Sequence, residues 1–195
     1  GYIANYIINV PDLKVKRIEN MKVIYQELKV KAANENISIK CIFLIRSCMH
    51  YGNKKTIVYV STAEDIKEYE VAIEELREYF CIKINCWILT SKRTHNQRQK
   101  ILEDFATLEG FNFLLSYKIL NECIDIPSCD SIYITRPRKQ AKISSIQRLC
   151  RANRLDPNNP NKVALVNLWC DEGSDVVDFL SHLKEFDTGF SVQKV

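Results

Sequence analysis

Thr56-Ile57-Val58-Tyr59-Val60 is an uninterrupted apolar run of β-type residues, and Ser61-Thr62 follows it directly. Such a run predicts a strand that is buried on both faces, which is typical of parallel sheets. Residues 64–80 then place apolar side chains at helical spacing, with Lys and Glu between them. The stretch therefore predicts a strand followed by a helix that packs back onto the sheet.

The same alternation extends from this unit in both directions along the chain. Downstream we expect strands at 82–89, 111–115, 131–135 and 163–169, and helices at 94–108, 142–154 and 174–186, the last with Ser174 as its N-cap. Upstream we expect a strand at 2–10, a helical stretch from Leu13 that is interrupted at Asn34, and a helix at about 36–50. The order predicts an α/β fold with a doubly wound, mostly parallel sheet, helices on both faces, and an N-terminal strand and helical segment.

Composition and charge place the chain among ordinary globular proteins. It has 195 residues, 46% of them apolar, and a net charge of +4 from 28 Lys and Arg against 24 Asp and Glu. No apolar run is long enough to span a membrane. We expect residues 1–54 to lead into a main domain at 55–195. The mild positive charge permits a polyanionic partner without requiring one.

The eight cysteines show no C-x-x-C pair and no zinc-finger spacing with the histidines. Most lie in apolar runs, so we expect reduced, buried thiols rather than disulfides or a metal site. Reduced thiols are typical of a reducing compartment, here the cytoplasm or the nucleus.

Two segments carry the residues of chemical interest. On a helix over 145–154, Gln147, Arg151 and Arg154 fall within an arc of about 60°, and guanidinium groups match phosphate oxygens well. The alternative is a solvated helix end with surface arginines. The other segment, Ser116 to Pro127, follows a buried strand, begins with a hydroxyl and a lysine and ends with Asp125 between isoleucines. On its own, it is equally consistent with a structural turn.

In this order, the segments resemble the C-terminal RecA-like lobe of superfamily 2 helicases. Residues 56–62 resemble helicase motif IV, 111–127 resemble motif V, and 147–154 resemble motif VI. The opening residues 1–6 resemble, more weakly, the passage out of the first lobe in helicases of large DNA viruses, so a viral protein in a host cell is one possible source.

The resemblance implies a role for individual residues. Arg151 and Arg154 would be catalytic, with Arg154 as the arginine finger, while Gln147, Asp125 and Glu122 would contact ATP. The nucleic-acid backbone, DNA or RNA, would be bound by Ser61, Thr62, Ser91, Arg98, Ser116 and Lys118. For the basic residues a solvated surface is the alternative.

The sequence also departs from the family. Cys123 and Cys150 stand where motifs V and VI have glycine, and the chain has no phosphate loop and no Asp-Glu-x-His strand end. The resemblance therefore implies a piece of a longer polypeptide whose N-terminal lobe holds ATP and Mg, so the piece alone is expected to be inactive. The alternatives are an inactive helicase-like lobe that binds nucleic acid or protein, and a standalone α/β protein with accidental motif matches.

Overall fold

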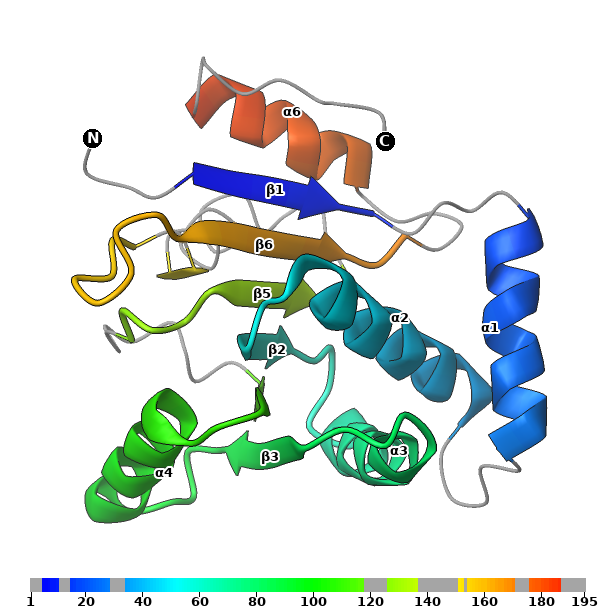
Figure 1. The fold of residues 1–195 in the computed structure, drawn as a ribbon, viewed down its shortest axis with the longest axis horizontal. Helices are drawn as coiled ribbons and strands as arrows, with labels where there is room; N and C mark the ends of the chain where they lie inside the picture. The colour runs from blue at the N-terminus through cyan, green and yellow to red at the C-terminus, as the bar shows by residue number, and fades with distance from the viewer. Residues whose placement is uncertain are drawn as a thin grey trace.

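The computed structural model describes residues 5–10, 15–28, 34–117, 126–136, 151–152, 154–170 and 176–186. Within them a six-stranded sheet has the order β1-β6-β5-β2-β4-β3, and every pairing is parallel (Figure 1). The strands are β1 (Asn5–Asn9), β2 (Lys55–Tyr59), β3 (Ile84–Leu89), β4 (Phe111–Ser116), β5 (Ser131–Ile134) and β6 (Val163–Leu168). The predicted α/β fold with a parallel sheet is confirmed.

The strand that opens the sequence pattern, β2, lies between β4 and β5. Ile57 and Tyr59 belong to the apolar cluster on one face of the sheet, and Val58 and Val60 belong to the cluster on the other. All four side chains are buried, as the uninterrupted apolar run predicts.

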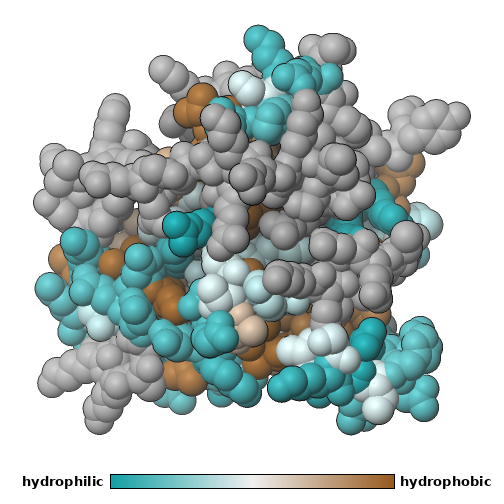
Figure 2. Space-filling model, turned by 180° about the vertical axis from the view of Figure 1, so that it is seen from behind, coloured by the Kyte–Doolittle hydropathy of each residue, from teal (hydrophilic) through white to brown (hydrophobic). Residues whose placement is uncertain are grey.

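Helices cover both faces of the sheet. The helices α1 (Val15–Leu28), α2 (Glu35–Tyr51) and α3 (Asp65–Tyr79) contribute buried residues to one cluster. The helices α4 (His95–Thr107) and α6 (Val176–Phe186) contribute to the other. Figure 1 shows α6 beside the β1 end of the sheet, while α3 and α4 lie toward β3. Figure 2 shows mostly hydrophilic side chains on the described surface seen from behind, with small apolar areas between them.

Helix ends follow local signals that are visible in the sequence. The Asn34 side chain accepts a hydrogen bond from the Asn36 N–H at 2.9 Å and so caps the start of α2, which ends at Gly52 in the left-handed conformation. Thr94 and Gln97 form a reciprocal capping box at the start of α4. Within the described residues, no helix is both long and apolar enough to cross a membrane.

The sequence predicts a helix over 142–154, which extends further along the chain than the helix in the structure. Arg151 and Ala152 are helical, whereas Arg154 lies outside any helix. The physical reason lies in the turn that follows, because the residue before a proline disfavours helical backbone and Asp156 precedes Pro157. The Asp156 side chain also accepts from the Asn158 N–H at 2.9 Å, which favours a turn. Most of this predicted helix, and the predicted Ser174 cap, lie outside the described residues.

Candidate functional site

Hydroxyl groups gather where three neighbouring strands end. The Val60 N–H donates to the Ser116 carbonyl at 3.0 Å, and the Thr135 N–H donates to the Tyr59 carbonyl at 3.2 Å. These bonds hold the end of β2 between the ends of β4 and β5. The Ser61 hydroxyl lies 3.3 Å from that of Thr135, which also donates to the Tyr59 carbonyl at 3.0 Å.

Two of these hydroxyl residues are enclosed, since Ser116 and Thr135 are each 1% exposed. The Oγ of Ser116 has no hydrogen-bond partner in the described part of the chain. Thr135 was not among the residues predicted from sequence, although its position at a strand end is a signal that could have found it. Hydroxyls at such an edge can bind phosphate oxygens without reading base sequence.

Thr62, the next predicted residue, has a structural contact. Its Oγ1 accepts from the N–H of Asp65, the first residue of α3, at 3.2 Å, although the N-cap position itself is Glu64. That first turn carries Asp65 and Glu68, and these carboxylates oppose a phosphate at the helix N-terminus. Thr62 therefore helps to shape this edge, and any phosphate contact would use the hydrogen of its hydroxyl.

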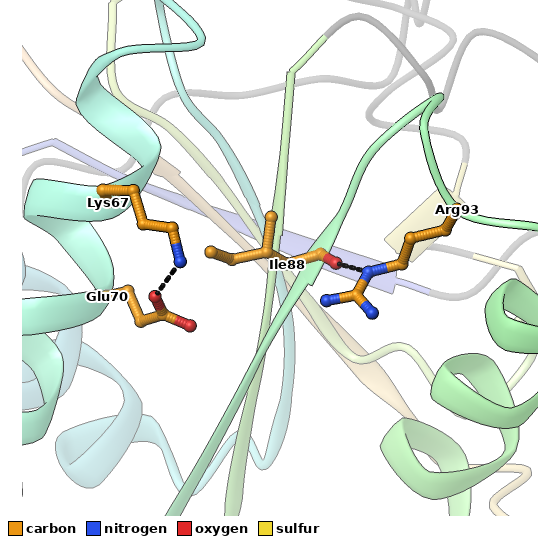
Figure 3. A network of polar contacts seen from close by, with 4 residues as sticks. All are labelled: Lys67, Glu70, Ile88 and Arg93. Carbon is orange, nitrogen blue, oxygen red and sulfur yellow. Dashed lines mark hydrogen bonds and ion pairs between the residues drawn. The ribbon is translucent and has the colours of Figure 1, made fainter.

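The loop after β3 is organised by two arginines. The Arg98 guanidinium donates to the carbonyls of Arg93 and Ser91 at 3.0 and 3.1 Å. Arg93 donates through Nε to the Ile88 carbonyl at 2.9 Å, as Figure 3 shows beside the Lys67–Glu70 ion pair of α3. Ser91 is exposed in this loop. Arg98, predicted as a nucleic-acid contact, thus uses two of its five donors to hold the loop that presents Ser91.

The two predicted catalytic arginines lie in different surroundings. Arg151 is 8% exposed, beside the fully buried Ala152, so it is not a solvated surface arginine. Arg154 is half-buried and non-helical, so the predicted helical arc that groups it with Gln147 and Arg151 is wrong at Arg154. The predicted site residues Gln147, Asp125, Glu122 and Lys118 lie outside the described residues, as do Cys123 and Cys150.

A metal ion in a protein is held by several ligating side chains that lie close together. Among the described residues, no cluster of three or more His, Cys, Asp or Glu side chains is arranged to hold a cation. The sequence has no glycine-rich phosphate loop with its lysine.

Comparison with known families agrees with this arrangement. Residues 35–156 match the family described as helicase conserved C-terminal domain. The chain belongs to this family. The matched range of the helicase C-terminal domain contains the hydroxyls at the ends of β2, β4 and β5, the loop after β3, and both arginines. No curated protein sequence matches the chain at a significant level.

Solved structures share the fold at low sequence identity. The ATP-dependent Type ISP restriction-modification enzyme LlaBIII bound to DNA gives a TM-score of 0.71 at 15% identity, over 95% of this chain and 14% of that one. The C-terminal domain of the DEAD-box protein Dbp5 gives 0.54 at 14% identity, over 97% of this chain and 88% of that one. Domain 2 of the DEAD-box helicase Mss116p, bound to an RNA duplex, gives a TM-score of 0.53 at 15% identity, over 82% of this chain and 57% of that one.

These likenesses, at 14–15% identity, concern the fold alone. The chain corresponds to only 14% of the length of the LlaBIII chain. It matches most of the Dbp5 C-terminal domain. The chain is therefore comparable in extent to the Dbp5 C-terminal domain and spans a small part of the LlaBIII chain.

Proposed function

We propose that this helicase C-terminal domain is the second lobe of an ATP-dependent nucleic-acid helicase or translocase. The observation that carries the proposal is the family match over residues 35–156, which contains both Arg151 and Arg154. The burial of Arg151 supports it, because a guanidinium is enclosed only where other groups compensate its charge. Turnover would require an N-terminal lobe of the same polypeptide, and the chain alone would be inactive.

The nucleotide would lie between the two lobes. Arg154 would act as the arginine finger, stabilising negative charge that develops on the phosphates in the transition state, an effect worth about 10³–10⁵ in rate. Arg151 would assist from its buried position, and Gln147, Asp125 and Glu122 would contact the nucleotide. Magnesium held by the N-terminal lobe would supply charge neutralisation at the phosphates.

A nucleic-acid strand would follow the carboxyl ends of the parallel strands. Ser61, Thr62 and Ser116 would contact its backbone there, joined by Lys118 and by the loop that Arg98 holds around Ser91. The DNA bound to LlaBIII and the RNA bound to Mss116p support a polynucleotide partner without deciding between the two. The kinship with helicases of large DNA viruses stays a prediction, since it depends on residues 1–6.

Arg154→Ala tests the proposal in the full-length polypeptide. We expect kcat for ATP to fall by at least about tenfold, because the finger acts in the transition state, with little change in nucleic-acid affinity measured by a salt titration. Arg77→Ala is the matched control, since Arg77 forms a solvent-exposed pair with Glu74 at 3.0 Å and should leave both quantities unchanged.

Two outcomes would contradict parts of this proposal. Normal turnover of Arg154→Ala would exclude the finger assignment. A parent protein that binds nucleic acid but hydrolyses no ATP would favour the alternative, an inactive lobe that serves as a binding module, for which the cysteines at 123 and 150 in place of family glycines are the sequence argument.

A further inference from the structure

A polar cluster, formed by the buried Asn53 and Lys162 and the half-buried Asp130, lies at the amino end of the sheet, away from the hydroxyl edge. We call it the clasp. Lys162 is 5% exposed, and its ammonium donates to the carbonyls of Pro127 and Cys129 at 2.8 and 3.0 Å. The lysine immediately before β6 is therefore tied to the segment immediately before β5.

The other two members of the clasp tie the same segment to the start of β2. The Asp130 carboxylate accepts from the backbone N–H groups of Lys54 and Lys55, both at 2.9 Å. The Asn53 amide donates to the Asp130 carbonyl at 2.9 Å. Residues far apart in the sequence thus meet in one hydrogen-bonded unit.

The clasp encloses two opposite charges. Burial raises the pKa of Asp130, while the N–H groups of Lys54 and Lys55 and the nearby Lys162 charge act in the opposite direction. Burying an ammonium and a carboxylate is costly unless their hydrogen bonds are made, and here carbonyls and amides make them. Apolar side chains could fill the same space, so the clasp is better explained by the geometry it imposes than by stability.

The geometry concerns the two segments proposed to face ATP. Pro127 comes two residues after Asp125, and Lys162 comes eight residues after Arg154. The connection from Arg154 to Lys162 is a turn closed by hydrogen bonds from Asn159 N–H to the Asp156 carbonyl at 2.9 Å and from Lys162 N–H to the Asn159 carbonyl at 3.1 Å. The clasp therefore holds the downstream ends of both segments together through a short, hydrogen-bonded connection.

Apolar packing reinforces this link. Ala152, Ile126 and Cys129 are buried members of the same cluster on the α4 and α6 face of the sheet. The helical residue next to Arg151 and the segment gripped by Lys162 thus share one core. A change at Lys162 can reach Arg154 along the turn and through this packing.

We propose that Lys162 is a positioning residue, which acts through the clasp to set the placement of Arg154 relative to the segment that ends at Pro127. This inference depends on the proposed finger role of Arg154. Lys162 touches neither nucleotide nor nucleic acid in this assignment. Its loss should therefore change turnover only as long as Arg154 is present.

A double-mutant cycle in the full-length polypeptide tests this dependence. Lys162→Met removes the clasp donor, Arg154→Ala removes the finger, and the double variant combines them. We expect Lys162→Met to lower kcat for ATP about fivefold with KM for ATP within about twofold, and the double variant to be no slower than Arg154→Ala alone. A purely structural role would instead make the two effects multiply.

Lys40→Met is the matched control. Lys40 is also a buried lysine, 9% exposed, but it lies in α2 on the opposite face of the sheet. We expect any effect of this variant on kcat to be the same with and without Arg154→Ala. Asn53→Ala, which removes a different bond of the clasp, gives a second measurement if Lys162→Met does not fold, and it should show the same dependence on Arg154.

The outcomes separate the two proposals. Suppose that Arg154→Ala lowers turnover, and that the clasp variants lower it by the same factor with and without Arg154→Ala. The positioning role is then overturned, and the finger assignment stands. The positioning role is also overturned if Lys162→Met leaves kcat unchanged. If Arg154→Ala alone turns over normally, the finger assignment fails, and the positioning role fails with it.

Discussion

Arg98 illustrates how much of a single residue's role depends on its neighbours in space. Its charge predicts a contact with phosphate, yet its guanidinium is bound to carbonyls five and seven residues earlier in its own loop. Lys162 shows the converse, because nothing in its sequence context distinguishes it, while the structure gives it two carbonyl partners at the amino end of the sheet. Both residues position other groups, which a one-dimensional pattern of charge does not reveal.

The thiols give a prediction at this scale. Burial raises the pKa of Cys48 and of Cys129 to about 12, so both stay neutral thiols between pH 7 and pH 9. The thiolate is the form that reacts with alkylating reagents, so both side chains should react slowly. We expect iodoacetamide at pH 8 to alkylate the exposed Cys81 in the folded chain and to spare these two. Peptide mass spectrometry would check this. Modification in urea provides the control, since all three should then react, and rapid alkylation of Cys48 in the folded chain would contradict the burial.

Individual elements end where backbone conformation requires it. Gly52 closes α2 with φ of 76°, and Gly110 turns the chain from α4 into β4 with φ of 99°. A Cβ at Gly52 would meet nothing within 4 Å, whereas a Cβ at Gly110 would lie 2.6 Å from the Lys83 carbonyl oxygen. Positive φ therefore has a different steric setting at the end of α2 and in the turn before β4.

Alanine substitution at these two glycines tests that difference. Gly52→Ala should cost about 1–2 kcal/mol of unfolding free energy, because only the left-handed conformation is penalised. Gly110→Ala should cost more, since the backbone at Lys83 or at residue 110 must also move to relieve the contact with the Lys83 carbonyl oxygen. Urea unfolding of the two variants measures both values. Equal losses would show that the turn before β4 yields without strain.

At the scale of the whole molecule, the sheet extends beyond the part that the family match covers. The match begins at residue 35, but β1 pairs with β6 along its whole length, from Asn5 opposite Val163 to Asn9 opposite Asn167. The Asn9 amide also donates to the Ser47 hydroxyl of α2 at 2.8 Å. The N-terminal strand is thus an integral edge of the same sheet.

Removal of residues 1–33 would test this integration. The truncated chain loses β1 and α1, so β6 becomes an open edge that can pair with another chain. We expect its melting temperature to fall by roughly 10 °C, at 2–4 °C per kcal/mol for a domain of this size, and light scattering to detect oligomers. Removal of residues 1–4 alone is the control and should leave the melting temperature and the light scattering unchanged. An unchanged melting temperature for the longer truncation would show that β1 contributes little.

Local patterns were sufficient for the strands and the fold class. Thr56 to Val60 identifies a strand buried on both faces, and the alternation of strands and amphipathic helices implies a parallel sheet, because period and burial are properties of neighbouring residues. Hydroxyls at Ser61 and Ser116 follow from their positions at strand ends. The helix near Arg154 was misjudged because its end depends on the competing turn at Asp156, although that signal is also local.

The clasp could be found only in three dimensions. Lys162 and Pro127 are separated by 35 positions, and Asp130 and Lys54 by 76. They meet because β6, β5 and β2 are adjacent in the sheet. Apolar patterns do not encode this order, since all buried strands have a similar apolar pattern. The burial of Arg151 has the same origin, because exposure depends on which elements pack over a residue. The local sequence around Arg151 does not indicate which elements these are.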